Sequence, residues 1–336
     1  MAAAPDATLA AAPGAATAAL PDGRWRPLEV AFWLLVVLVL LALPDYRVLA
    51  SQILITGLFA VSLDLILGYA GIVSLGHAAF FGLGAYTAGL LAVHGWGEPL
   101  SGLLTAAAVA AAAGFLVSLL VVRGSDLTRL MVTLGIGLML YEAANKAASV
   151  TGGVDGLSGV TMWKVLGLWS FDLGGRTACF YSLAVLFGLF VLMRRLVNSP
   201  LGLSLRGIRE GGKRMPAIGA PVARRLRMIF TLAAAVAGIA GALLAQTTQF
   251  VGIDTLGFPR SAELMIMLVM GGTGRLYGGI VGAAVFMIAQ DYLSGIDPVY
   301  WQFWIGFFLV IIVLFAHGGI LGGLEALRVR RRGRAR

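Results

Sequence analysis

The sequence predicts an all-α, polytopic membrane protein with about ten transmembrane helices and both termini in the cytoplasm. Three observations favour this fold class: the composition, the recurrence of apolar runs of membrane-spanning length, and the distribution of Lys and Arg. Hydrophobic residues make up 59% of the 336 residues and charged residues only 12%, whereas about a quarter of the residues in soluble domains are charged. The mean hydropathy of +0.91 likewise indicates that most of the chain lies in a lipid bilayer.

Apolar runs repeat along nearly the whole chain. A helix needs roughly 20 mostly apolar residues to cross a hydrocarbon core about 30 Å thick. We expect spans at 28–44, 48–68, 76–94, 99–122, 130–148, 177–197, 228–250, 261–275, 277–294 and 299–316. The run 261–275 is the shortest and is also compatible with a broken or re-entrant helix. Together the runs predict a transmembrane domain over residues 28–322.

Two tails flank this domain. Residues 1–27 are rich in Ala and Pro and have no basic segment ahead of an apolar one. They therefore predict a disordered cytoplasmic tail rather than a signal peptide. Residues 323–336 predict a basic cytoplasmic tail, and the largest cytoplasmic loop is expected at 198–227.

The basic residues predict the orientation, because cytoplasmic loops of membrane proteins carry an excess of Lys and Arg. With both termini inside, 20 of the 25 basic residues fall on the cytoplasmic side. Nine of them lie between Arg194 and Arg227, and six lie between Arg328 and Arg336. The outer side keeps the remaining five, which are Arg47, Lys146, Lys164, Arg176 and Arg260.

Several classes of protein are excluded by the residue inventory. The net charge of +9 comes without a basic stripe interleaved with aromatic residues, so no nucleic-acid partner is expected. Cys179 is the only cysteine, which rules out an intramolecular disulfide and a multi-cysteine metal site. A nucleotide-binding G-x-x-x-x-G-K-[ST] motif is missing, since GGTGRLYGG at 271–279 lacks its Lys and Ser/Thr. The histidines, none of them beside a nucleophile motif, are His77, His94 and His317. We expect no catalytic residue, metal or cofactor.

Four acidic residues lie in or beside apolar runs, where a charge is costly and each should face protein or water. Asp64 lies deep in the second run, and we expect it to have a structural or pathway role. Glu142 and Asp291 lie near the ends of runs, where interfacial water can solvate them. Glu263 begins a run after Pro259 and can complement the positive end of that helix.

Many of the 46 glycines lie inside the apolar runs, where small residues let helices approach closely. Gly278 and Gly282 have G-x-x-x-G spacing and predict a helix–helix contact. The segment Gly-Tyr-Ala-Gly at 68–71 is expected to interrupt the second helix. Such a break is tolerated in a membrane only where protein or a water-filled cavity satisfies the freed backbone groups.

The loop at 198–227 predicts a short amphipathic helix. Ser199 can cap its N-terminus, and Pro200 suits its first turn. Arg206 and Arg209 are expected on its polar side, and two glycines at 211–212 end it. The apolar residues of the helix recur at three- or four-residue intervals, at Leu201, Leu205 and Ile208. An ordinary cytoplasmic loop needs only its charges, so this pattern favours a surface on which a partner docks.

The long outer loop at about 149–176 begins with TGGVDGLSGV, whose glycines and Asp155 favour turns over a helix. Two interpretations of this loop stay open. It is either a connector or a surface that meets a protein delivering a solute.

In combination, six motifs resemble one family. From about residue 50 to 325, the sequence resembles the M-type permease subunit of high-affinity branched-chain amino-acid ABC importers. The matching motifs are GYAGIVSLGHAAFFGLGAY at 68–86, VTL at 132–134, TGGVDGLSGV at 151–160, NSPLGLSLRGIRE at 198–210, AGIAGALLA at 237–245 and GGTGRLYGGIVGA at 271–283.

The resemblance implies a multi-pass permease of the bacterial inner membrane. Its implied partners are a second, homologous permease subunit, two cytoplasmic ATP-binding subunits and a periplasmic solute-binding protein. The resemblance assigns coupling to the ATPases to Ser199, Pro200, Gly202, Arg206, Arg209, Glu210, Ala217 and Gly219. The translocation pathway is expected near Asp64, Gly68, Tyr69, Gly71, Ser74, Gly76 and His77.

The solute is left open, because the family also includes permeases for urea, short amides and other small solutes. Family members usually carry Asn where this chain has Asp64. The alternative function is an ion-coupled secondary transporter or channel, in which Asp64 would be the coupling site.

Overall fold

The computed structural model describes residues 27–323, apart from 166, 173, 213 and 316–317. The two predicted tails therefore lie outside the described residues, apart from residues 27 and 323 at their inner edges, and so does His317. Within the described part, all regular secondary structure is helical, and the extended segments form only two isolated bridges.

The helices follow the apolar runs. Their bounds are α1 Pro27–Ala42, α2 Arg47–Asp64, α3 Ala78–Val93, α4 Pro99–Val121, α5 Asp126–Lys146, α6 Ala148–Thr151, α7 Arg176–Val197, α8 Pro200–Gly211, α9 Val222–Thr248, α10 Phe258–Gly271, α11 Leu276–Ile296 and α12 Trp301–Phe315. The shorter 3-10 or π segments are η1 Pro44–Tyr46, η2 Leu65–Tyr69, η3 Gly153–Asp155, η4 Pro216–Ile218 and η5 Ile253–Leu256.

Each of the ten predicted spans coincides with one helix, which confirms an all-α, multi-pass membrane protein. Among the described residues, six helical stretches are long and apolar enough to cross a bilayer. They comprise α2 with its flanking turns, α4, α5, α7, α9 and α11. The helix that overlaps the predicted span 261–275 is α10, which begins three residues earlier, is unbroken and is only 14 residues long. A count of ten spans and a cytoplasmic location of both termini stay predictions.

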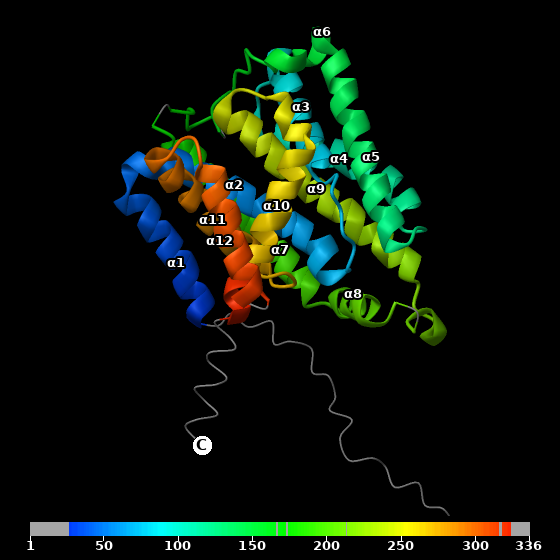
Figure 1. Ribbon diagram of the computed structural model, residues 1–336. Coiled ribbons are helices and arrows are strands. Elements are labelled where there is room, and N and C mark those ends of the chain that lie inside the picture. Colours follow the sequence, from blue (N-terminus) through cyan, green and yellow to red (C-terminus); the bar gives the residue numbers. More distant parts are fainter. Residues whose placement is uncertain (1–26, 166, 173, 213, 316–317, 324–336) are drawn as a thin grey trace, which may run out of the picture.

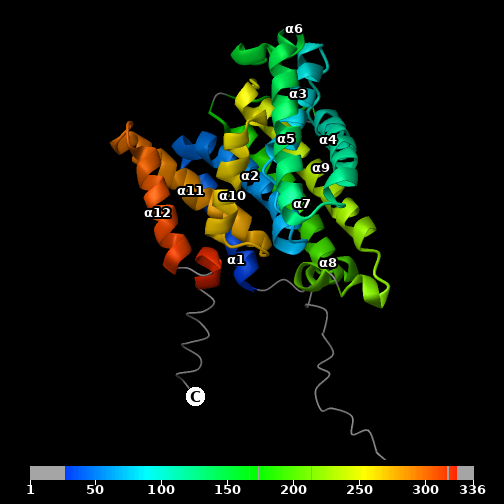
Figure 2. The ribbon, with the colours of Figure 1, turned by 45° about the vertical axis from the view of Figure 1, so that its right-hand side comes forward.

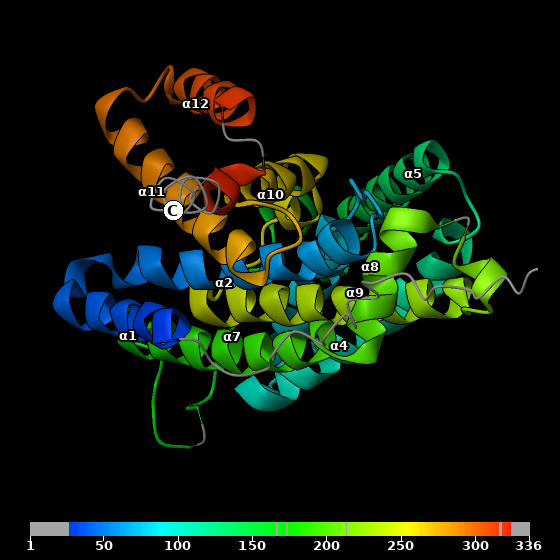
Figure 3. The same cartoon turned by 90° about the horizontal axis from the view of Figure 1, so that it is seen from below.

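Helices α2 and α9 lie at the centre of the molecule (Figure 3). Every residue from Leu54 to Asp64 of α2 is buried, because α2 packs against α7, α9, α10 and α11. Peripheral helices instead expose large apolar side chains, such as Leu34 of α1, Leu104 of α4 and Met139 of α5. A helix that is apolar all round and buried is a core helix, and the exposed apolar surface suits contact with lipid.

Close helix contacts depend on glycine. A Cβ on Gly278 would collide with the carbonyl oxygen of Gly272, and a Cβ on Gly282 with that of Met267. Helices α10 and α11 therefore approach each other backbone to backbone at these two positions.

The two ends of the bundle differ. Helix α8 lies across the end at which α1 begins and α12 ends, at the bottom of Figures 1 and 2. We call this the α8 end. Helix α6 and much of the segment 152–175 lie at the opposite end, which we call the α6 end.

One local prediction is wrong in detail. Ser199 is the residue before α8, but its side chain makes no capping hydrogen bond. Its hydroxyl instead donates to the carbonyl oxygen of Leu196 at 2.6 Å, which ties it back to the end of α7. Helix α8 otherwise agrees with the sequence: it begins at Pro200 and buries Leu205 and Ile208.

Candidate functional site

A group of residues far apart in the sequence meets where α2 runs into η2, beside α8 and the turn between α10 and α11. We call this group the Asp64 cluster; its members are Asp64, Gly68, Tyr69, Arg206, Arg209 and Gly274. It joins two sets of residues that the sequence suggested separately, one for the pathway and one for coupling.

Asp64 is completely buried. Its Oδ1 atom accepts a hydrogen bond of 2.7 Å from the backbone N–H of Gly274, 210 residues along the chain. Its Oδ2 atom has no hydrogen-bond partner among the described residues. The carboxylate therefore fixes the turn between α10 and α11 against the end of α2.

Gly68 lies directly beside this bond. A Cβ at this position would collide with Oδ1 of Asp64 and with the backbone nitrogen of Gly274. The π-helical segment η2 that contains Gly68 replaces the last turn of the helix, and the chain then runs without regular structure to α3. The interruption predicted from the glycines is present, and it brings the backbone carbonyl of Gly68 within reach of α8.

Two arginines of α8 contact this segment. Nη1 of Arg209 donates a hydrogen bond to the carbonyl oxygen of Gly68. The guanidinium carbon of Arg206 lies 5.3 Å from the centre of the Tyr69 ring, within the range of a cation–π contact. These two contacts hold helix α8, which lies across one end of the bundle, against the buried end of α2.

Three other residues suggested for the pathway lie in the core. Nε2 of His77 is 2.9 Å from Oγ of Ser62, whose own proton goes to the carbonyl oxygen of Phe59 at 2.6 Å. His77 Nε2–H is therefore the donor to Ser62. Ser74 is buried as well, and a Cβ on Gly76 would collide with the carbonyl oxygen of Thr133. These contacts pack the segment 70–77 between α2 and α5.

The residues suggested for coupling divide into an inner and an outer set. Gly202 packs against the carbonyl of Val197, and the two arginines contact η2. Glu210, Ala217 and Gly219 are exposed. Two apolar side chains at the same end are exposed as well: Leu203 by 45% and Ile218 by 76%.

A polar cavity that the sequence did not reveal lies in the half of the molecule nearer the α6 end. We call it the α10 cavity, and its volume is about 660 Å³. Its charged residues are Asp254, Arg260 and Glu263. Its other lining residues are Gln52, Thr56, Leu138, Tyr141, Leu244, Ile253, Thr255, Gly257, Phe258, Pro259, Met287 and Gln290.

The sequence could not reveal this cavity, because its lining residues come from α2, α5, α9, η5, α10 and α11. The sequence indicates Glu263 only as a complement to the positive end of a helix. The local signal is the presence of Arg260 and Glu263 together near the start of a predicted span.

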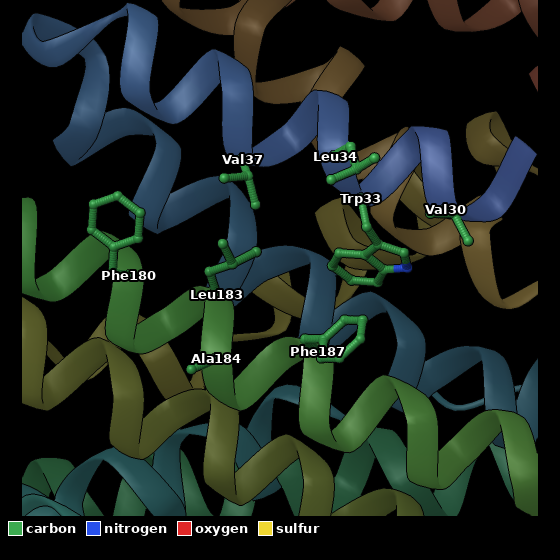
Figure 4. A pocket seen from close by; sticks show the side chains of 8 residues that line it. All are labelled: Val30, Trp33, Leu34, Val37, Phe180, Leu183, Ala184 and Phe187. Atoms are coloured by element: carbon green, nitrogen blue, oxygen red, sulfur yellow. The ribbon is translucent and has the colours of Figure 1, made fainter.

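An apolar cavity between α1 and α7 contrasts with it (Figure 4). Its volume is about 560 Å³, and it is lined by Val30, Trp33, Leu34, Val37, Phe180, Leu183, Ala184 and Phe187. None of these lining side chains is charged, so this cavity suits an acyl chain rather than a polar solute.

Several transport permeases are similar to this chain. The high-affinity branched-chain amino acid transport system permease protein LivM of Salmonella typhimurium is 28% identical over 300 residues, which cover 81% of this chain and 69% of that protein. The LivM protein of Escherichia coli matches to the same extent. The corresponding LivH permease of Escherichia coli is 23% identical over 290 residues, covering 81% of this chain and 92% of that protein.

No solved structure matches this chain significantly. The model of one family, described as the branched-chain amino acid transport system / permease component, matches residues 47–316. This match covers the helices from α2 to α12 and includes both the Asp64 cluster and the α10 cavity. The chain therefore belongs to the branched-chain amino acid transport permease family.

Proposed function

We propose that this chain is one of two membrane-spanning subunits of an ATP-driven importer in the bacterial inner membrane. It moves a branched-chain amino acid or a related small solute and has no enzymatic activity of its own. The observation that carries the proposal is the family match over residues 47–316. Relatives named LivM and LivH both match this chain, which supports a pair of homologous permeases.

The remaining partners in this proposal are two cytoplasmic ATP-binding subunits and a periplasmic solute-binding protein. The start of α1, the end of α12 and helix α8 all lie at one end (Figure 1). Most of the Lys and Arg of the predicted loops belong to that same end, which supports a cytoplasmic location for it. The α6 end then faces the periplasm and meets the binding protein.

Helix α8 is the coupling element in this proposal. Its exposed Leu203 and the nearby Ile218 offer apolar surface to a groove of an ATPase subunit. On the side toward the spans, Arg206 and Arg209 contact η2. A rigid-body movement of the ATPase would therefore pull on the end of α2 and on the turn before α11.

Co-purification from detergent-solubilised membranes tests the proposal. We expect two ATP-binding subunits and a second permease to be recovered with this chain and identified by mass. Recovery of the chain alone, under conditions in which a control importer stays assembled, would count against it. So would uptake driven by an ion gradient in vesicles that contain only this chain, because that result would favour the secondary transporter.

Reconstitution with the ATPases tests the role of α8. Replacing both Arg206 and Arg209 by Glu should abolish solute-dependent ATP hydrolysis. A carboxylate cannot donate a hydrogen bond to the Gly68 carbonyl and cannot form a cation–π contact with Tyr69, so both contacts with η2 would be lost. If that hydrolysis persists at the normal rate, α8 does not couple the ATPases to the spans.

A further inference from the structure

We propose that the α10 cavity is a solute-binding site and that it recognises a zwitterionic α-amino acid through charges of both signs. Arg260 binds the carboxylate, and Asp254 and Glu263 bind the ammonium group. This inference rests on the proposed function, and it replaces an open list of small solutes by one chemical class.

The size and lining of the cavity suit such a solute. Ligand sites typically have volumes of about 300–1,000 Å³ and combine apolar walls with a few polar groups, and this cavity has about 660 Å³. Leu138, Leu244 and Met287 give apolar walls for an aliphatic side chain, while the charged residues lie together around η5 and the start of α10.

Contacts within the protein hold Arg260 in place, but they leave its guanidinium group able to bind a ligand. Its guanidinium carbon lies 5.8 Å from the centre of the Phe81 ring. Its Nη1 atom is 3.4 Å from Oε2 of Glu263, which is a long contact. Their side chains are 28% and 41% exposed, and half-exposed pairs of this kind contribute little to stability. A carboxylate can therefore take the fork of Arg260 in a bidentate pair.

The backbone adds to this preference. Helix α10 begins at Phe258, directly at the cavity, and the positive end of a helix favours an anionic group there. The ammonium group of the same solute then has two acceptors, the exposed Asp254 and the Glu263 that the carboxylate releases from Arg260. Urea and simple amides carry no charge and would leave this set of charges unmatched.

The location also fits a solute that arrives from the periplasm. The cavity is lined by the first half of α2 and the second half of α11, which both lie toward the α6 end. The Asp64 cluster lies at the other end of α2, so the site and the coupling element are separated along one buried helix.

Protection of an introduced cysteine tests the site without relying on ATP-driven transport. Cys179 is the natural cysteine of this chain and is buried, so a Gln290→Cys variant adds a reactive thiol at the cavity wall. In the assembled complex, we expect leucine to slow labelling of this thiol by a methanethiosulfonate at least threefold. The labelled position is identified by mass within this chain.

Two analogues and two variants define the recognition. Leucinamide lacks the carboxylate and 4-methylpentanoate lacks the ammonium group, so neither should protect the thiol at the same concentration. Arg260→Ala should abolish protection by leucine, and Arg260→Lys should weaken it. Arg176→Ala is the matched control, because it removes a positive charge at the same end without touching this cavity, and it should leave protection unchanged.

The outcomes separate this inference from the proposed function. If the wild-type complex imports leucine but leucine does not protect the thiol, the site is wrong while the importer stands. Equal protection by both analogues would overturn recognition of the zwitterion, as would import of urea or an amide with no competition from leucine. If the ATPases do not assemble with the chain, or the complex imports neither an amino acid nor another small solute, the proposed function fails instead.

Discussion

The Asp64 cluster and the α10 cavity are built from the same residue types, a carboxylate and arginine, but in opposite settings. Asp64 is completely buried and accepts from a backbone N–H at 2.7 Å. Arg260 and Glu263 are half-exposed and meet side chain to side chain at 3.4 Å. A carboxylate fixed to the backbone holds parts of the fold together, whereas a partly exposed pair with a long contact of 3.4 Å can exchange its partner for a ligand. The burial and the partner of a charged residue, rather than its type, therefore distinguish a residue that holds the fold together from one that can bind a ligand.

Gly68→Ala should have the largest effect, because the added Cβ would collide with the Asp64 carboxylate and the Gly274 nitrogen. Overpacking a filled core typically costs about 1–3 kcal/mol or more, and here both atoms belong to the bond that holds the turn. We expect little monodisperse protein by size-exclusion chromatography of a detergent extract. Gly188→Ala in α7 is the control, since a Cβ there meets nothing within 4 Å. Equal yields of the two variants would contradict the description of the cluster.

Asp64→Ala should destabilise the protein by about 1–3 kcal/mol, because it leaves the partly buried N–H of Gly274 without its acceptor. Asp64→Asn keeps an acceptor oxygen and should lose much less. The thermal unfolding midpoint in detergent measures both changes. If Asn is as damaging as Ala, the role of Asp64 depends on its charge, which would favour an ion-coupling site.

Glu263→Gln tests the α10 cavity in the same way, with the opposite expectation: solute uptake should change, but stability should not. The side chain is 41% exposed, and its ion pair with Arg260 is long at 3.4 Å. The free energy of unfolding should therefore stay within about 0.5 kcal/mol of the wild type. Leucine uptake by the reconstituted complex should nevertheless fall several-fold. A fall in stability with no fall in uptake would make Glu263 part of the framework.

Ser199→Ala should have the smallest effect. Loss of a true capping side chain costs about 1 kcal/mol, but this hydroxyl bonds to the carbonyl oxygen of Leu196 and does not cap α8. We expect a change below about 0.5 kcal/mol in thermal unfolding, and a larger loss would show that the hydroxyl does stabilise the start of α8.

The sequence predicted most of the helices, because a membrane requires a long apolar run for each span. It also predicted the break after Asp64 and the extent of α8, since glycine, proline and the spacing of apolar residues act locally. It did not predict the direction of Arg209, which depends on a contact with Gly68, 141 residues away. The α10 cavity was missed for the same reason: no local pattern joins Gln52 to Gln290.

We propose different roles for the two regions: solute binding in the α10 cavity and coupling to the ATPases at the Asp64 cluster. Leucine protection of the Gln290→Cys thiol, measured together with ATP-driven leucine uptake in the Arg209→Ala and Arg260→Ala variants, tests this claim most directly. We predict that Arg209→Ala keeps protection and loses uptake, whereas Arg260→Ala loses both. Loss of protection in Arg209→Ala, or full protection in Arg260→Ala, would show that the two regions do not have these separate roles.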